Sequence, residues 1–165
     1  MDIQKYIEYV KGRYADIDIV RTYYFTSQTD KNGPFLQQIN RIPYTQVIAG
    51  RLQEKTIKID ARSGIRCPKC SEDIENTFVT QVDKGTDVNI AVEMLKHAYN
   101  KAYDTAILIS RDADFAGVVK IIKDLGLNVE LVLFEDSRLE AQELSETVDN
   151  ITLIEKSEYP GLERI

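Results

Sequence analysis

The sequence predicts an α/β protein with a mainly parallel central sheet. Two short, mostly apolar runs, residues 105–109 (TAILI) and 129–134 (VELVLF), are separated by a helical stretch over residues 115–125 that ends at Gly126. Such runs suit strands that are buried on both faces, and a strand, helix, strand order builds a parallel sheet. Ahead of them, the apolar residues of positions 88–102 recur at helical spacing, which predicts a long helix packed on one face.

The remaining elements follow from the same kind of pattern. Apolar residues at helical spacing over residues 3–14 predict an opening helix that Gly12 or Asp16 ends. β-branched and aromatic residues predict a strand over residues 18–25, followed by a polar loop over residues 26–34. A short helix over residues 35–41 and a strand over residues 45–49 come next, and an acidic helix over residues 138–148 precedes a last edge strand at residues 151–154.

Length and composition predict one domain spanning residues 1–165, because 165 residues with 43% apolar side chains fit a single ordinary core. A net charge of −6 argues against a protein that coats nucleic acid through bulk electrostatics. No apolar run approaches the ~18 residues of a membrane span, and the first residues carry charges where a signal peptide needs an apolar core. We therefore expect a cytoplasmic protein without a membrane partner.

The middle of the chain has a different character, and we interpret about residues 51–80 as a basic insertion that contains a CxxC pair. Between residues 51 and 69 two acids, Glu54 and Asp60, face six bases: Arg51, Lys55, Lys58, Arg62, Arg66 and Lys69. Such a stretch could follow RNA phosphates, although a run of charge is more often a solvated face.

Polar residues directly after buried strands are the first candidates for a site, because ligands of open α/β sheets bind beyond the carboxyl ends of the strands. Ser110, Asp112 and Asp114 follow the first apolar run, and Asp87 opens the long helix. Each aspartate alone is explained as a helix cap or a first-turn acid. If both helices start at one sheet edge, however, the three carboxylates converge and predict a site for a hard divalent cation.

Two runs carry a resemblance to a known family: KGTDVNIAVEMLKHAY, and after it YDTAILISRDADFAGVVKIIKDLGLNVELV. They resemble the NYN domain of the PIN-like nuclease superfamily, in its LabA-like branch. The resemblance implies a Rossmann-like three-layer fold whose acidic edge binds Mg²⁺ or Mn²⁺ and cleaves RNA. It makes Asp87, Asp112 and Asp114 the catalytic metal-site acids. It also implies that Ser110 helps to hold the site and that Lys84 meets a substrate phosphate. Arg111 is a further candidate for binding a substrate phosphate on its charge alone, although an exposed arginine after a strand is more often solvated.

Two departures from the family pattern matter. The family typically opens with a buried strand that ends in an aspartate, whereas here Met1 and Asp2 run straight into the first helix, so we expect that strand to be lacking. Arg111 stands where the family often has glycine. A metal-dependent ribonuclease is therefore weighed against a catalytically impaired module of the same fold that binds RNA or a protein. A sheet without its first strand also exposes an edge that a partner or a second copy could fill, which adds a homodimer to the expected partners.

Cys67 and Cys70 form half of a zinc site, since structural zinc usually takes four ligands. Two protomers that each contributed the pair would complete a structural Zn²⁺ site shared between them. The alternative is a reduced, solvent-facing pair. His97, the single histidine, is expected to be a surface residue, whereas Phe115 and the aromatic run at residues 23–25 are expected in the core.

Overall fold

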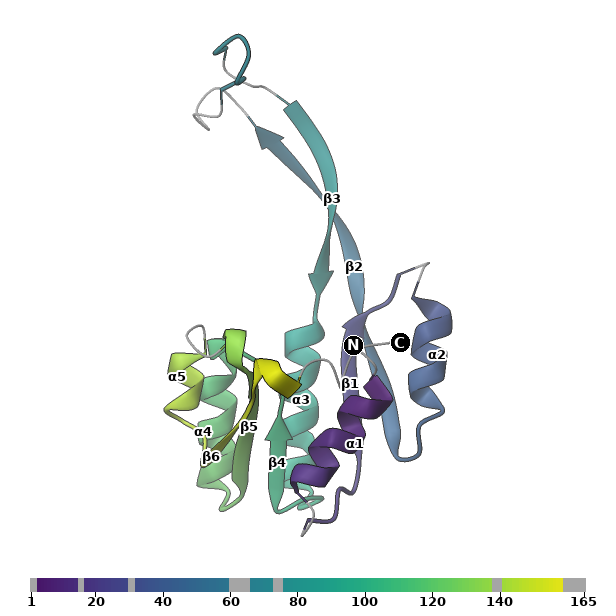
Figure 1. Cartoon of the computed structure of the whole chain (residues 1–165), viewed down its shortest axis with the longest axis vertical. Helices are drawn as coiled ribbons and strands as arrows, with labels where there is room; N and C mark the ends of the chain where they lie inside the picture. Colours follow the sequence, from purple (N-terminus) through teal and green to yellow (C-terminus); the bar gives the residue numbers. More distant parts are fainter. Residues whose placement is uncertain are drawn as a thin grey trace.

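The computed structural model describes residues 3–14, 17–29, 32–59, 66–72, 76–137 and 141–158 of the 165-residue chain. Helices and strands alternate through most of this length, which confirms the predicted α/β class (Figure 1). In chain order the elements are α1 (Ile3–Arg13), β1 (Thr22–Ser27), α2 (Gly33–Asn40), β2 (Thr45–Ile59), β3 (Asn76–Lys84), α3 (Thr86–Tyr99), β4 (Thr105–Leu108), η2 (Ala113–Phe115), α4 (Ala116–Asp124), β5 (Asn128–Phe134), η3 (Glu135–Ser137), α5 (Gln142–Ser145), β6 (Asn150–Ile154) and η4 (Lys156–Glu158).

Within the described residues the strands form two three-stranded sheets, in the orders β1-β2-β3 and β4-β5-β6. β1 pairs in parallel with β2, and β4, β5 and β6 are parallel throughout, while β2 and β3 are antiparallel. The predicted parallel character is therefore confirmed, and β6 is an edge strand as expected. The division into two sheets is a finding that the sequence did not indicate. That the chain lacks the family's first strand stays a prediction.

Helix α1 packs against both sheets. One side of the helix joins Tyr6, Val10 and Tyr14 in a buried cluster with β5 and β6 residues Val132 and Ile154. The other side places Ile7 in a second buried cluster with Leu36 and Ile39 of α2, against which Tyr24 of β1 and Val47 of β2 also pack. Figure 1 shows α1 lying across the space between β1 and β4. The helix therefore fixes the two sheets relative to each other.

Strand β5 is buried on both faces, as its apolar sequence predicts. Val129, Leu131 and Leu133 belong to the cluster that contains Ala98 of α3 and Val119 and Ile122 of α4. The alternate residue Val132 faces α1 instead, with Phe134 packed beside it. Because successive side chains of a strand point to opposite faces, this alternation produces three layers, with α3 and α4 on one face and α1 on the other. Phe115 is also in this core, as expected.

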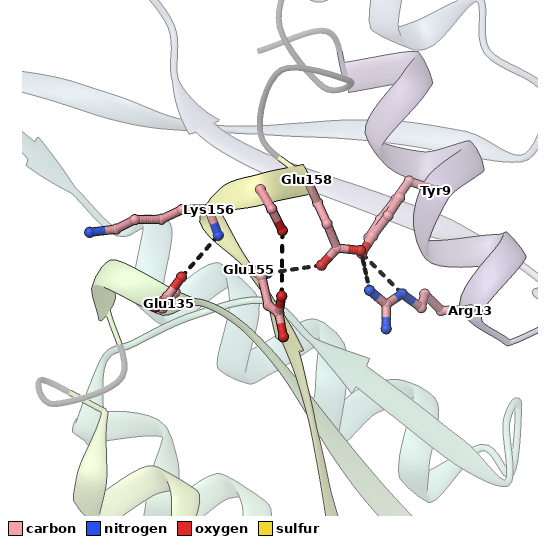
Figure 2. Close-up of polar contacts among 7 residues, drawn as sticks. Tyr9, Arg13, Glu135, Glu155, Lys156 and Glu158 are labelled. Carbon is pink, nitrogen blue, oxygen red and sulfur yellow. Dashed lines mark hydrogen bonds and ion pairs between the residues drawn. The ribbon is translucent and has the colours of Figure 1, made fainter.

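Polar contacts attach the chain after β6 to α1 (Figure 2). The Glu158 carboxylate accepts hydrogen bonds from the Tyr9 hydroxyl and the Arg13 guanidinium. Within the same turn, the Glu155 N–H donates to the other oxygen of Glu158 at 2.9 Å, and the Lys156 N–H donates to Glu135 at 2.9 Å. The Tyr14 hydroxyl shares a further hydrogen bond of 2.9 Å with the Thr152 hydroxyl of β6. These contacts fix the position of α1 relative to β6 and the second sheet.

Three predicted boundaries are wrong. β2 is 15 residues long rather than ending at residue 49, because β3 pairs with its second half outside the body of the protein. β1 begins at Thr22, later than the predicted start at residue 18. The predicted acidic helix over residues 138–148 is a four-residue α5, and residues 138–140 lie outside the described part of the chain. Among the described helices, none has the length and apolar character needed to cross a membrane.

Replacing Tyr6 with phenylalanine is expected to stabilise the protein. The Tyr6 hydroxyl is buried without a hydrogen-bond partner among the described residues, and this burial raises its pKa far above the usual range. Removing an unsatisfied buried hydroxyl recovers a desolvation cost, so Tyr6→Phe is expected to raise the unfolding free energy by about 1 kcal/mol. Urea denaturation measures the change. Tyr14→Phe is the matched control, because it loses the hydrogen bond to Thr152 and is expected to lower the unfolding free energy by about 1 kcal/mol. Equal effects of the two substitutions would contradict this.

Candidate functional site

Helix α3 begins just beyond the end of β3, and helix η2 begins shortly after the end of β4. The first turn of each helix contains one aspartate. β3 ends at Lys84, and Gly85 turns the chain into α3 with φ of 92°, a left-handed conformation that glycine adopts without strain. Asp87 lies in the first turn of α3. In the second sheet, β4 ends at Leu108 and Asp112 immediately precedes η2, whose first turn contains Asp114. The acids predicted from the sequence therefore do lie at strand exits.

The capping interpretation is correct for Asp112. Its Oδ1 accepts a hydrogen bond of 2.9 Å from the Asp114 N–H, and its own N–H donates to the Ser110 hydroxyl at 3.2 Å. These two contacts fix the strand exit over residues 110–114. A carboxylate can accept on both oxygens, so a cap through Oδ1 is compatible with a second interaction through Oδ2. Asp114 is exposed, and Ser110 is half-buried.

For Asp87 the capping interpretation is wrong. Gly85 occupies the N-cap position of α3, and no side chain caps the helix there. The environment of Asp87 is instead defined by other acids: partial burial raises its pKa, and the negative charges of Asp112, Asp83 and Asp114 raise it further. Asp87 thus interacts electrostatically with the acids of the second sheet. That Asp87, Asp112 and Asp114 converge into one cation site stays a prediction.

Asp83 is an acid of this site that the sequence reasoning missed. It accepts hydrogen bonds from the Ser27 hydroxyl and, at 2.8 and 2.7 Å, from the Thr86 hydroxyl, and these bonds lower its pKa. Ser27 is the last residue of β1, and Thr86 is the first residue of α3. Asp83 therefore connects the carboxyl end of β1 to the start of α3. Its position four residues before Asp87, across a glycine turn, is the signal that could have indicated it.

Gly50 of β2 allows this arrangement. A Cβ atom at Gly50 would lie 2.5 Å from the Thr86 hydroxyl oxygen and 3.1 Å from Asp83 Oδ1. The first distance is shorter than packed atoms tolerate, so any side chain here would displace Thr86. Glycine at this buried position lets the β2 backbone support the Asp83–Thr86 pair.

The predicted basic residues lie at the edges of this acidic group. Lys84 is exposed at the end of β3 and is the direct cross-strand neighbour of Arg51. Like charges at directly opposite positions destabilise a sheet, so this pair of cations does not contribute to the pairing of β2 with β3. Arg111 is exposed between Ser110 and Asp112.

His97 is not the unpartnered surface residue that was expected. Its Nε2 shares a hydrogen bond of 2.7 Å with the Tyr23 hydroxyl and lies 3.1 Å from the Glu93 carboxylate. The side chain is half-buried, and its ring packs against that of Tyr23. His97 therefore attaches α3 to β1. This contact leaves it in a structural role, away from the acidic edge.

The donor chemistry of the acidic group fits a hard cation, because carboxylate oxygens are the usual ligands of Mg²⁺ and Mn²⁺. The mutual repulsion of the acids at Asp87 is what a bound cation would relieve. Over the described ranges, however, no three His, Cys, Asp or Glu side chains converge closely enough to form a ligand set as they stand. The acids follow strands of two different sheets, which share no hydrogen-bonded strand pair in those ranges.

Comparison with known proteins identifies the family. The sequence profile of the NYN domain family matches residues 1–155, and the chain belongs to this family. Members of the family are typically nuclease-like domains that bind RNA and use divalent metal ions. Among solved structures, a crystal structure of the protein of unknown function VPA0982 from Vibrio parahaemolyticus is similar, with a TM-score of 0.54. Its sequence is 20% identical, and the match covers 88% of this chain and 77% of that chain, so the likeness shows the fold. No curated protein matches the chain.

The opposite pKa shifts of Asp87 and Asp83 predict that replacing each aspartate with asparagine has opposite effects on the unfolding free energy. Asp87 has a raised pKa, so folding favours its protonated form, and its charge reduces stability as the pH rises above its ordinary value of 3.8. Asp83 has a lowered pKa, so its charge contributes stability that is present above that ordinary value and is lost as the pH falls through its folded-state value. Without added metal, Asp87→Asn is therefore expected to raise the unfolding free energy near neutral pH, whereas Asp83→Asn is expected to lower it.

Urea denaturation at about pH 7 and about pH 3 tests both signs, since both effects should be smaller at the lower pH, where each acid is protonated to a greater extent. A destabilising Asp87→Asn at neutral pH would show that the carboxylates do not repel one another in the folded protein.

Proposed function

We propose that the chain is a metal-dependent ribonuclease that hydrolyses RNA phosphodiester bonds at the acidic edge, and that it belongs to the LabA-like branch of its family. The observation that carries the proposal is the placement of Asp87 in the first turn of α3 and of Asp112 and Asp114 just after β4, in a domain whose family is nuclease-like. Desolvation raises the pKa of Asp87, and the charges of Asp112, Asp83 and Asp114 raise it further, which supports a concentration of negative charge there. The branch assignment rests on the Lys-Gly-x-Asp motif at residues 84–87 and the Ser-x-Asp-x-Asp-Phe motif at residues 110–115.

Asp87, Asp112 and Asp114 would hold the cation, which is Mg²⁺ or Mn²⁺ because a site of oxygen donors accepts both. The chemistry that such a cation supplies is polarisation of the scissile phosphate and a lower pKa for the attacking water. Asp83 is a positioning residue, since its bonds to Thr86 and Ser27 fix the start of α3, from which Asp87 projects. Ser110 holds the Asp112 backbone at 3.2 Å and lies where a substrate phosphate would be bound.

The hairpin formed by β2 and β3 supplies the cations for an RNA strand. By the β-pairing register, Arg51, Lys55 and Lys84 lie on one face of the hairpin, because Arg51 opposes Lys84 and side chains alternate along each strand. The opposite face, which carries Gly50 and Asp83, is the one that lies against Thr86 at the start of α3. The face of Arg51 and Lys84 reaches the start of α3 only at the base of the hairpin, because α3 begins two residues after Lys84. RNA phosphates bound along it would lead to the acidic edge, where Arg111 adds a further positive charge. In this proposal residues 1–165 are one NYN domain, and the basic insertion at about residues 51–80 is its RNA-binding arm.

Cleavage of a labelled single-stranded RNA tests the enzymatic proposal. The protein with Mn²⁺ or Mg²⁺ is expected to cut the RNA, and EDTA or the double substitution Asp112→Asn with Asp114→Asn is expected to reduce the rate by about 100-fold or more, since electrostatic catalysis through such groups contributes on that scale. Asp124→Asn is the control, because Asp124 is an exposed acid at the end of α4.

The second candidate is a catalytically impaired NYN module that regulates by binding RNA or a protein. The lack of a converged ligand set among the described residues favours it. A folded protein that binds RNA but does not cut it with either metal would select this function. Cutting that persists in the double variant or with EDTA would reject the proposed metal site.

The arm predicts a specific salt dependence of RNA binding. Arg51→Ala with Lys84→Ala is expected to weaken binding and to reduce the slope of log K against log salt concentration by about 1.4, since each phosphate contact to a single strand contributes about 0.7. Fluorescence anisotropy over a salt series measures the slope. Lys120→Ala on α4 removes an exposed charge remote from the arm and should leave the slope unchanged. An unchanged slope in the double variant would place the RNA elsewhere.

A further inference from the structure

The arm formed by β2 and β3 projects from the body as a ribbon of two strands (Figure 1). Its register runs without interruption from the pair Arg51 and Lys84 to the pair Ile59 and Asn76. Phe78 and Val79 lie on it with 43% and 61% of their surface exposed. An isolated two-stranded ribbon is marginally stable in water, so an arm of this length needs an additional constraint. The natural place for such a constraint is the tip, where residues 66–72 carry both cysteines.

Residues 67–72 form a tight turn whose backbone groups face the first thiol. The Ser71 N–H donates to the Cys67 carbonyl at 2.9 Å, and the Cys67 N–H donates to the Glu72 carbonyl at 2.8 Å. Ser71 has a positive φ of 59°, which reverses the chain directly after Cys70. The backbone N–H groups of Cys70 and Lys69 also face the Cys67 sulfur. The turn thus holds Cys67 and Cys70 on one short reversal of the chain, at the spacing at which two cysteines bind one zinc ion.

The chain cannot complete a zinc site of cysteine and histidine ligands by itself. Structural zinc usually takes four such ligands in a tetrahedron, and the sequence contains two cysteines and one histidine. His97 lies in α3, where it is bonded to Tyr23 and Glu93. Figure 1 shows α3 in the body of the protein, well away from the tip of the arm. Two further thiolates must come from another molecule.

We propose that Cys67 and Cys70 are half of a structural zinc site that the same two cysteines of a second copy of the chain complete. The two arms then meet tip to tip, and the cluster of metal and thiolates supplies the constraint that each ribbon needs. The number of ligands supports a second copy as the partner. Two cysteines from each of two tips make the four ligands that structural zinc usually takes, and a two-fold axis makes the two halves of such a site equivalent.

Zinc content and mass in solution test this proposal together. The background is Asp112→Asn with Asp114→Asn, so that the acidic edge does not contribute metal. Elemental analysis of this protein is expected to give one zinc for every two chains, and light scattering after size exclusion is expected to give a dimer. Cobalt in place of zinc should give the intense thiolate charge-transfer absorption of a tetrahedral site with four sulfur ligands. Cys67→Ser with Cys70→Ser should lose both metal and dimer.

Two controls keep the test informative if the serine variant folds poorly. Removing zinc from the unsubstituted cysteines with a chelator should give a monomer that becomes a dimer again when zinc is restored. His97→Gln should retain zinc and dimer, because His97 is a ligand of neither copy. One zinc per monomer, which Glu72 beside Cys70 could assist, would overturn the proposal. So would the absence of zinc, or a dimer that survives both chelation and the loss of the thiols.

Discussion

Burial of helix α1 between two sheets is the interaction on which the rest of the structure depends. Among the described strands, β1 and β4 belong to different sheets, so no ladder of backbone hydrogen bonds joins the halves of the protein. Apolar contacts do so instead: α1 buries Tyr6, Val10 and Tyr14 against one sheet and Ile7 against the elements around the other. On the opposite face α3 makes the second connection, through His97 and Tyr23. Helix packing, rather than strand pairing, sets the relative position of the sheets.

This construction determines the character of the acidic edge. Asp83 and Asp87 are fixed by the first sheet and the start of α3, whereas Asp112 and Asp114 are fixed by the exit from β4. Each half is held locally by hydrogen bonds, from Ser27 and Thr86 on one side and from the turn at residues 110–114 on the other. The acids affect one another's ionisation across the two halves. Small movements of α1 or α3 would change the separation of these carboxylates, which couples the packing of the core to the chemistry of the edge.

The arm adds a second functional region that is independent of this core. Its base lies beside the acidic edge and carries Arg51 directly opposite Lys84. Two like charges at such positions destabilise the pairing of β2 with β3, but they would attract a polyanion. Its tip carries the cysteine turn. The excess of bases is confined to one segment of the arm, residues 51–69, where six bases face two acids in a protein with a net charge of −6. Local placement of this kind is how an acidic protein can still attract a polyanion at one surface.

The sequence by itself determined the elements whose signal is local. The periodicity of residues 3–14 and 88–102 predicted α1 and α3, the apolar runs predicted β4 and β5, and the spacing of Asp112 and Asp114 predicted the cap. These succeed because a helix period or a cap involves residues within a few positions of one another. Only the tertiary structure decided the length of β2, the two sheets, the partners of His97 and the place of Asp83. Each depends on pairing between distant positions, such as Tyr23 with His97, 74 residues apart, and Ser27 with Asp83, 56 residues apart, which no local pattern records.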